Sequence, residues 1–228
     1  MYNQCLVTAT LLDSFDFAMS APNSPTKDDP KITWKQRGMK DFVGKIRREK
    51  VEYPSWVGMG MDFENVVYDK CRSSRTIEDA TDEGSEAFKA VVKEVYGGVF
   101  QNKLKRVLHI GSHKAFLFGF SDVEKDNLTI DIKTCKDWKG PQKYLDKAQH
   151  EMYLYMNGKD NFKYVVAEWD KDGNGNPIKP AKNVYTVDYI NPGENVLEKR
   201  LTEKIEKMWD YLVKENLWDD YWFTFSKN

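Results

Sequence analysis

The chain has 228 residues, of which 31% are charged and 40% hydrophobic, and its net charge is −1. A chain of this composition and length forms a water-soluble globular protein and buries roughly 70–75% of its unfolded surface without disulfide or metal cross-links. Its sequence lacks a run long enough for a membrane span, and its near-zero net charge argues against coating of nucleic acid, while leaving contact through a local basic patch open. The odd cysteine count (three) and an N-terminus without secretion-signal features predict a reduced, cytoplasmic location.

The first hundred residues are predicted to be helical. Helices are expected at about residues 9–18, 33–49, 60–71 and 85–96, with a Pro/Ser/Asp loop at 20–30. Residues 31–50 hold eight Lys or Arg against two acids, with Trp34 and Phe42 between them. Two interpretations stay open for this stretch. It is either a solvated amphipathic helix or a surface that contacts DNA phosphates through Lys35, Arg37, Arg47 and Arg48.

The second half predicts a small sheet followed by helices. Strands are expected at 105–113, 114–120 and 127–134, a helix at 141–158, a hairpin with KDGNGNP at its tip, and a long amphipathic helix at 194–216. The aromatic end of the chain, LWDDYWFTFSKN, is expected to pack on the protein's own core, with an oligomer interface as the alternative. This order of elements predicts an α/β (α+β) domain with a mixed central β-sheet flanked by helices.

Residues 118–134, FGFSDVEKDNLTIDIKT, combine apolar runs with charges at fixed places. Strand alternation puts Ile130 and Ile132 on one face, and Asp131 and Lys133 on the other. If the two strands of this segment pair, Asp122 lies beside Asp131. Two neighbouring carboxylates repel each other unless a cation lies between them, and carboxylate oxygens favour Mg²⁺ or Mn²⁺.

This pattern suits phosphodiester hydrolysis. A water on such a cation loses a proton more easily and becomes a nucleophile. Lys133 is placed to orient or deprotonate that water, or to neutralise charge in the transition state. Glu64, in the predicted helix GMDFENVVY, is the candidate third acid. For each acid taken alone, a solvated surface charge is the competing interpretation, and D-x-K by itself is a weak signal in so charged a chain.

The ordered set of motifs is more specific. The G-x-x-D of Gly119 to Asp122, I-D-I-K-T at 130–134 and the Q-x-x-x-Y of Gln149 to Tyr153 resemble the RecB-like branch of the PD-(D/E)XK nucleases. The segment from Gly60 to Tyr68 resembles the glycine-then-glutamate helix of the phage lambda-type (YqaJ-like) exonucleases. The resemblance covers roughly residues 58–158 and implies a restriction-endonuclease-like core. We expect one domain over residues 1–228, made of a helical part (about 1–58), a catalytic core (about 59–190) and a C-terminal helix with an aromatic tail (about 191–228).

The resemblance also implies roles for single residues. A Mg²⁺ or Mn²⁺ site would be formed by Glu64, Asp122, Asp131 and the backbone carbonyl of Ile132, with Lys133 as the catalytic lysine. Gln149 and Tyr153, four residues apart on one helix face, would face the site and hold the DNA strand or the lysine. Thr134 would bond a phosphate. Tyr153 as a core residue and Thr134 as a simple strand end are the alternatives.

The function predicted from these residues is a metal-dependent DNA exonuclease that processes duplex ends in phage-type recombination or repair. It would act in the cytoplasm, which is the host's if the protein is phage-encoded. Two alternatives stay open, a structure-selective or restriction-like endonuclease of the same fold and a non-catalytic DNA-binding protein. The implied partners are duplex DNA ends and a single-strand annealing or recombination protein, and no membrane. Lambda-type relatives form rings that enclose DNA, so a homo-oligomer is a further open expectation.

Overall fold

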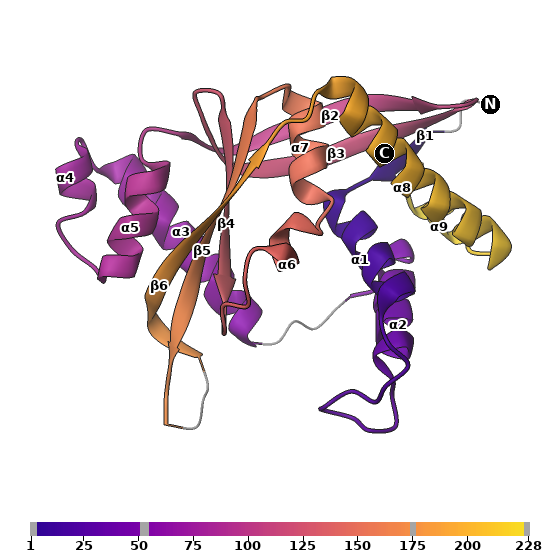
Figure 1. The fold of residues 1–228 in the computed structure, drawn as a ribbon, viewed down its shortest axis with the longest axis horizontal. Coiled ribbons are helices and arrows are strands. Elements are labelled where there is room, and N and C mark those ends of the chain that lie inside the picture. Colours follow the sequence, from indigo (N-terminus) through magenta and orange to yellow (C-terminus); the bar gives the residue numbers. More distant parts are fainter. Residues whose placement is uncertain (1–3, 51–54, 174–176, 226–228) are drawn as a thin grey trace.

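The computed structural model describes residues 4–50, 55–173 and 177–225, and Figure 1 shows its arrangement. The described helices are α1 (Ala9–Ser20), α2 (Trp34–Ile46), α3 (Ser55–Ser73), α4 (Ile77–Ala80), α5 (Glu86–Val95), α6 (Gln142–Leu145), α7 (Gln149–Asn157), α8 (Glu194–Lys214) and α9 (Trp218–Phe225). The described strands are β1 (Gln4–Val7), β2 (Val99–Ile110), β3 (His113–Lys125), β4 (Leu128–Cys135), β5 (Asn161–Lys171) and β6 (Pro177–Ile190). The mixed α/β class predicted from the sequence is confirmed.

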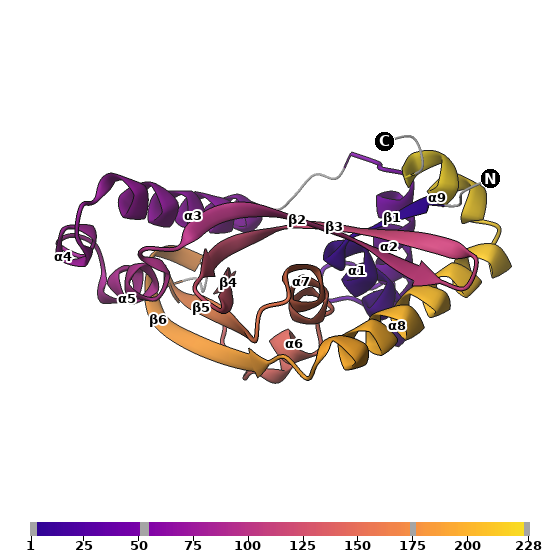
Figure 2. The same ribbon diagram turned by 90° about the horizontal axis from the view of Figure 1, so that it is seen from above.

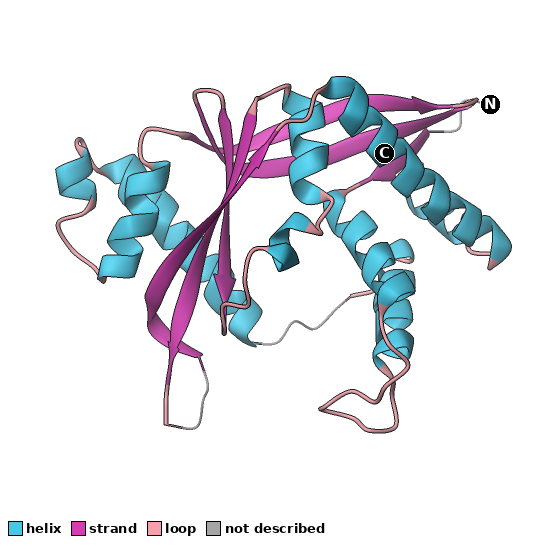
Figure 3. Ribbon diagram, in the orientation of Figure 1, coloured by secondary structure: helices cyan, strands magenta, loops and turns pink. Residues whose placement is uncertain are grey.

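The six described strands form one mixed sheet in the order β1-β3-β4-β5-β6, with β2 paired to β3 as well. The β1–β3 and β4–β5 pairs are parallel, and the other pairs are antiparallel. Although β3 and β4 follow one another, they pair only through residues 123–125 and 128–130. Beyond these residues β2 and β3 run across the top of Figure 3, while β4 to β6 descend from it. We call the place where they part, residues 118–122 of β3 and 131–134 of β4, the fork.

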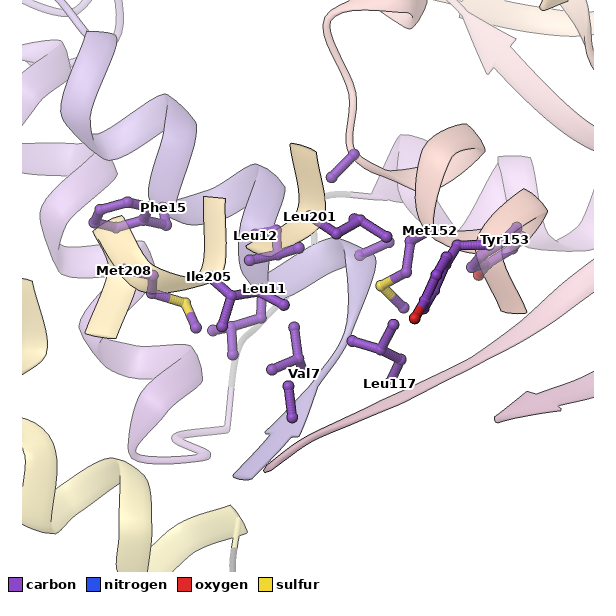
Figure 4. Close-up of a cluster of buried hydrophobic side chains, with 14 of the residues drawn as sticks. Val7, Leu11, Leu12, Phe15, Leu117, Met152, Tyr153, Leu201, Ile205 and Met208 are labelled. Atoms are coloured by element: carbon purple, nitrogen blue, oxygen red, sulfur yellow. The ribbon is translucent and has the colours of Figure 1, made fainter. Parts of the chain in front are cut away.

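The larger core lies between the β1–β3 part of the sheet and helices α1, α7 and α8 (Figure 4). Helix α8 shows how the sequence builds this layer, because its buried residues recur every three or four positions and form one apolar stripe. These residues are Leu197, Leu201, Ile205, Met208 and Leu212. Each such side chain contributes about 1.5–3 kcal/mol on full burial. The stripe thus fixes α8, and through it α7, on this face.

A second core covers the opposite face of β4 to β6 and is built mainly by α3 and α5. Ile130, Ile132 and Val165 enter it from the strands. Phe63 and Val67 of α3 are buried in this core, whereas Val66 is 54% exposed. The buried stripe of α3 continues through Tyr68 and Cys71 and so turns around the helix away from position 66. With helices on both faces, the sheet is the middle of three layers.

The helix predicted at 141–158 is interrupted in the structure. It is divided into α6 and α7 because the Ala148 amide donates to Asp13 Oδ1 at 2.7 Å instead of bonding within a continuous helix. Asp13 comes from α1, so a distant part of the chain decides where α7 begins. As a result Gln149 is the first residue of α7, which faces β4.

The C-terminal aromatic residues pack on the protein itself, as predicted. Trp218 contacts Trp209 with ring centroids 6.0 Å apart, and the fully buried Tyr221 donates to Leu6 O at 3.0 Å. Residues 174–176, at the tip of the predicted hairpin, lie outside the described residues. The expected division into parts at about residues 58 and 190 stays a prediction. None of the described helices combines the length and apolar character that a membrane span requires.

Candidate active site

The centre of the site is a buried ion pair on β4. The alternation of this strand sends Ile130 and Ile132 into the second core and turns Asp131 and Lys133 to the other face, as the sequence predicted. Asp131 is only 1% exposed, and its Oδ2 lies 2.5 Å from Lys133 Nζ. The lysine side chain is 36% exposed. The pair therefore joins a buried carboxylate to a lysine whose side chain is partly exposed.

Helix α7 holds the other oxygen of this carboxylate. Gln149 Nε2 donates to Asp131 Oδ1 at 2.5 Å. Asp131 Oδ2 is buried and accepts no hydrogen bond of good geometry from the described residues, in spite of its close approach to Lys133. Position 149 was predicted to face the site, and the structure places it there. Asp131 thus has one oriented oxygen and one that keeps capacity for a cation.

Asp122 is fixed at the fork by the backbone of β4. Its Oδ2 accepts a hydrogen bond from the Ile132 amide at 2.8 Å. The Ile132 amide lies beyond the last residue pair between β3 and β4, so β3 offers it no backbone carbonyl. The Asp122 carboxylate accepts the hydrogen bond of this amide instead. The contact brings Asp122 beside Asp131, as the sequence predicted, by a side-chain bond rather than by strand pairing.

Helix α3, which belongs to the second core (Figure 2), carries Glu64. The charges of Lys133 and Asp131 act on this carboxyl group. Burial raises the pKa of Glu64 to about 7, while the Lys133 charge lowers it and the Asp131 charge raises it. Close approach of α3 to β4 depends on Gly60, since a Cβ there would lie 2.8 Å from Thr134 Oγ1. Thr134 is thereby placed at the edge of the site, beneath α3.

The site concentrates negative charge. Burial and the Asp131 charge raise the pKa of Asp122 well above its ordinary value. Burial alone would lower the pKa of Lys133, but the charges of Asp131 and Asp122 outweigh it and raise that pKa. Three acids thus share one lysine, and such a group favours an additional cation.

The donor chemistry fits Mg²⁺ or Mn²⁺, because hard divalent ions prefer carboxylate and carbonyl oxygens and the site brings the carboxylates of Asp122 and Asp131 together. In the part of the chain that the structure describes, however, no three His, Cys, Asp or Glu side chains converge closely enough to hold an ion by themselves. The site formed by Glu64, Asp122, Asp131 and the Ile132 carbonyl therefore stays a prediction. Water molecules would complete the coordination of an ion held by so few protein oxygens.

Tyr153 lies in the core, as one of the two interpretations made from the sequence expected, and its role in holding the DNA strand or the lysine stays a prediction. It is 7% exposed and belongs to the larger core. Its ring also lies against β3 at Gly119, where a Cβ would be 2.8 Å from Tyr153 Cε1. Packing therefore explains why a glycine stands at the first position of the G-x-x-D motif, because the absence of a side chain lets α7 approach the strand that carries Asp122.

The basic segment 31–50 lies elsewhere. Its helix α2 packs against α1 and α9, and the fully buried Phe42 contacts Phe15 of α1 and Tyr211 of α8. The predicted DNA-contacting cations Lys35, Arg37 and Arg47 have partners within the protein. Lys35 donates to Met19 O at 2.7 Å, Arg37 pairs with Asp28 at 3.2 Å, and Arg47 pairs with Asp220 at 2.7 Å. The fourth, Arg48, has a positive φ of 52° at the end of the helix. The amphipathic-helix interpretation accounts for these contacts, and phosphate binding by these four residues stays a prediction.

Two residues near the site were missed from the sequence. Gln101 Nε2 donates to Tyr68 OH at 3.0 Å, and the charges of Asp122 and Glu64 act on that tyrosine. Tyr68 could have been found, because it follows Glu64 by four residues on the same helix. Gln101 could not, since only the fold brings β2 to α3.

Comparison with solved structures relates this fold to exonucleases. The structure of LHK-Exo in complex with dAMP aligns with a TM-score of 0.51 and 13% identity, over 92% of this chain and 88% of that chain. The chain therefore shares its fold with LHK-Exo. Another structure of this alkaline exonuclease, from Laribacter hongkongensis, gives 0.42 at 12% identity, over 92% of each chain. A phage-related exonuclease from Haemophilus somnus gives 0.39 at 12% identity, over 94% of this chain and 96% of that one. No protein-family model and no curated protein matches the sequence.

Proposed function

We propose that this protein is a Mg²⁺- or Mn²⁺-dependent DNA exonuclease that acts on duplex ends. The observation that carries the proposal is the convergence at the fork of Asp122, Asp131 and Lys133, which come from two strands that part at this point. The exonuclease fold, shared with a protein whose structure holds the nucleotide dAMP, supports a nucleic-acid substrate.

The residues would divide the work as follows. Asp122, Asp131 and Glu64, with the Ile132 carbonyl, would hold the ion, which when bound supplies Lewis acidity toward the phosphodiester. Lys133 would neutralise charge that develops on the phosphate, because its partly exposed side chain places a positive charge beside Asp131. Gln149 would keep Asp131 oriented through its 2.5 Å hydrogen bond. Thr134, at the edge of the site, would contact a phosphate.

The biological setting follows from the resemblance to phage lambda-type exonucleases. We infer a role in phage-type recombination or repair, in the cytoplasm, alongside a single-strand annealing or recombination protein. Co-purification of such a protein with the tagged chain from the cells that encode it would support this inference, and its repeated absence would count against it.

The experiment that tests the proposal compares linear duplex DNA with covalently closed circular DNA, each in Mg²⁺, Mn²⁺ or EDTA. An exonuclease requires an end, so we expect metal-dependent loss of the linear form while circles stay intact. Nicking or linearisation of circles would show an endonuclease instead. If neither DNA is cut and Mn²⁺ titration calorimetry detects no binding, the protein is a non-catalytic DNA-binding protein.

A further inference from the structure

The β2–β3 hairpin has an outer face of unusual composition. Its register pairs Lys103 with Phe120, Lys105 with Phe118, Val107 with Phe116 and His109 with Lys114. Side chains alternate along a strand, so these eight residues share one face, opposite to the one that bears Leu104, Leu108, Ala115 and Leu117. We call these eight residues the outer face. It consists of a row of phenylalanines beside a row that is mostly basic.

The outer face is open to solvent, whereas the inner one is packed. Helices α7 and α8 contact β2 on the inner side, and Figure 2 shows α1, α7 and α8 together on that side of the hairpin. On the outer face Phe120 is 46% and Val107 38% exposed. Phe116 and Phe118 are half-buried. Large apolar side chains that stay accessible on one face are a feature of binding surfaces.

The charges on this face are all of one sign. It carries Lys103, Lys105 and Lys114, and none of its eight residues is acidic. Neither Lys103 nor Lys105 forms an ion pair with any residue that the structure describes. Lys103 Nζ lies 5.3 Å from the ring centroid of Phe118, whose own centroid is 5.4 Å from that of Phe120. Cations placed beside aromatic faces suit a ligand that presents both phosphates and flat bases.

We propose that the outer face binds single-stranded DNA, with bases stacked on Phe118 and Phe120 and phosphates at the lysines. The identity of the ligand as DNA rests on the proposed function. Successive phenylalanines are two residues, or about 6.8 Å, apart along the strand. Stacked bases in a duplex are about 3.4 Å apart, so bases that reach neighbouring rings must be unstacked, as a single strand allows.

The position of this face relates it to the fork. Phe120 precedes Asp122 by two residues on β3, so the aromatic row ends beside the candidate active site. A DNA strand that enters or leaves the site at the fork would therefore meet Phe120 first. A second copy of this chain is a poorer occupant, because pairing the face with itself would bring lysines against lysines.

Binding to a fluorescein-labelled poly-dT oligonucleotide, followed by anisotropy in EDTA, tests the proposal without any cleavage. Stacking contributes about 1–3 kcal/mol per base, so we expect the Phe118→Ala/Phe120→Ala protein, which loses two stacking rings, to bind at least about 30-fold more weakly than the parent. The matched control is Phe17→Ala, which removes a ring of similar exposure (42%) from α1. Unaltered circular dichroism would show that the variants are folded.

A second pair of variants measures the phosphate contacts. For Lys103→Ala/Lys105→Ala we expect the slope of log affinity against log salt to fall by about 1.4, since each phosphate contact on a single strand contributes about 0.7. Lys207→Ala, an exposed lysine on α8, should leave the slope unchanged.

The outcomes separate this proposal from the proposed function. Parental affinity and slope in both double variants would overturn the outer-face proposal, even if metal-dependent cleavage were found. Weakened oligonucleotide binding would uphold it, even if the protein cut no DNA. A change in sedimentation of the Phe118→Ala/Phe120→Ala protein, with binding unaltered, would identify the face as a contact between copies of the chain and also overturn the proposal.

Discussion

Replacing Gly119 with alanine tests how closely α7 must approach the strand that carries Asp122. The new Cβ would lie 2.8 Å from Tyr153 Cε1 and 3.0 Å from its hydroxyl oxygen, below ordinary van der Waals contact. The tyrosine ring is 7% exposed and packs against Phe162 with centroids 6.3 Å apart, so it has little room to withdraw. Overpacking of this kind costs about 1–3 kcal/mol in the free energy of unfolding.

A double-mutant cycle assigns this cost to the contact. In a Tyr153→Ala background the ring is gone, and we expect Gly119→Ala to change the free energy of unfolding by no more than about 0.5 kcal/mol. Urea unfolding of the four proteins measures the cycle. An equal cost of Gly119→Ala in both backgrounds would refute the close-approach explanation. Gln149 lies one turn before Tyr153 on α7 and holds Asp131. We therefore also expect the single Gly119→Ala variant to cleave DNA more slowly. A displacement of catalytic groups by about 1 Å is enough for a ~10²-fold loss of rate.

Two further predictions concern stability. Burial, with smaller effects from Lys204 and Arg200, lowers the pKa of His150 from 6.5 to about 4, so the unfolded chain binds this proton more readily. The contribution of neutral His150 to the free energy of unfolding is fully present above about pH 6.5. It falls by about 3 kcal/mol as the pH drops toward 4. Urea unfolding at pH 7.5 and 4.5 should therefore show a weaker pH dependence in His150→Gln, and the same dependence in both proteins would contradict the assignment. Phe42→Ala should cost about 3–5 kcal/mol and Phe42→Leu much less, because the ring is fully buried, and a small loss in calorimetry for Phe42→Ala would show that the core under α2 is not closely packed.

The local pattern of the sequence was enough to predict which side chains β4 turns to each of its faces. The alternation of Ile130, Asp131, Ile132 and Lys133 requires only that the segment be a strand, and β4 follows it. Helices α1, α5 and α8 were likewise found from the spacing of apolar residues. These features depend on neighbours within a few positions, which a single sequence displays.

The remainder depends on contacts between distant parts of the chain. Strand β1 has only four residues and is recognisable through its pairing with residues 114–117 of β3. The break between α6 and α7 is set by Asp13, which is 135 positions away from Ala148. The parting of β3 and β4, which leaves the Ile132 amide for Asp122, is also a property of the whole sheet. No local pattern encodes these contacts.

The most direct test of the central claim is the rate at which linear duplex DNA is degraded in Mg²⁺ by the parent, by Lys133→Ala and by the control Lys207→Ala. Our account predicts a ~10²–10³-fold loss for Lys133→Ala, the effect of removing one preorganised charge from a catalytic site. It also predicts a parental rate for the control and no degradation by any of the proteins in EDTA. Degradation by Lys133→Ala at the parental rate would contradict the account, because the ion pair at the fork would then have no part in the reaction.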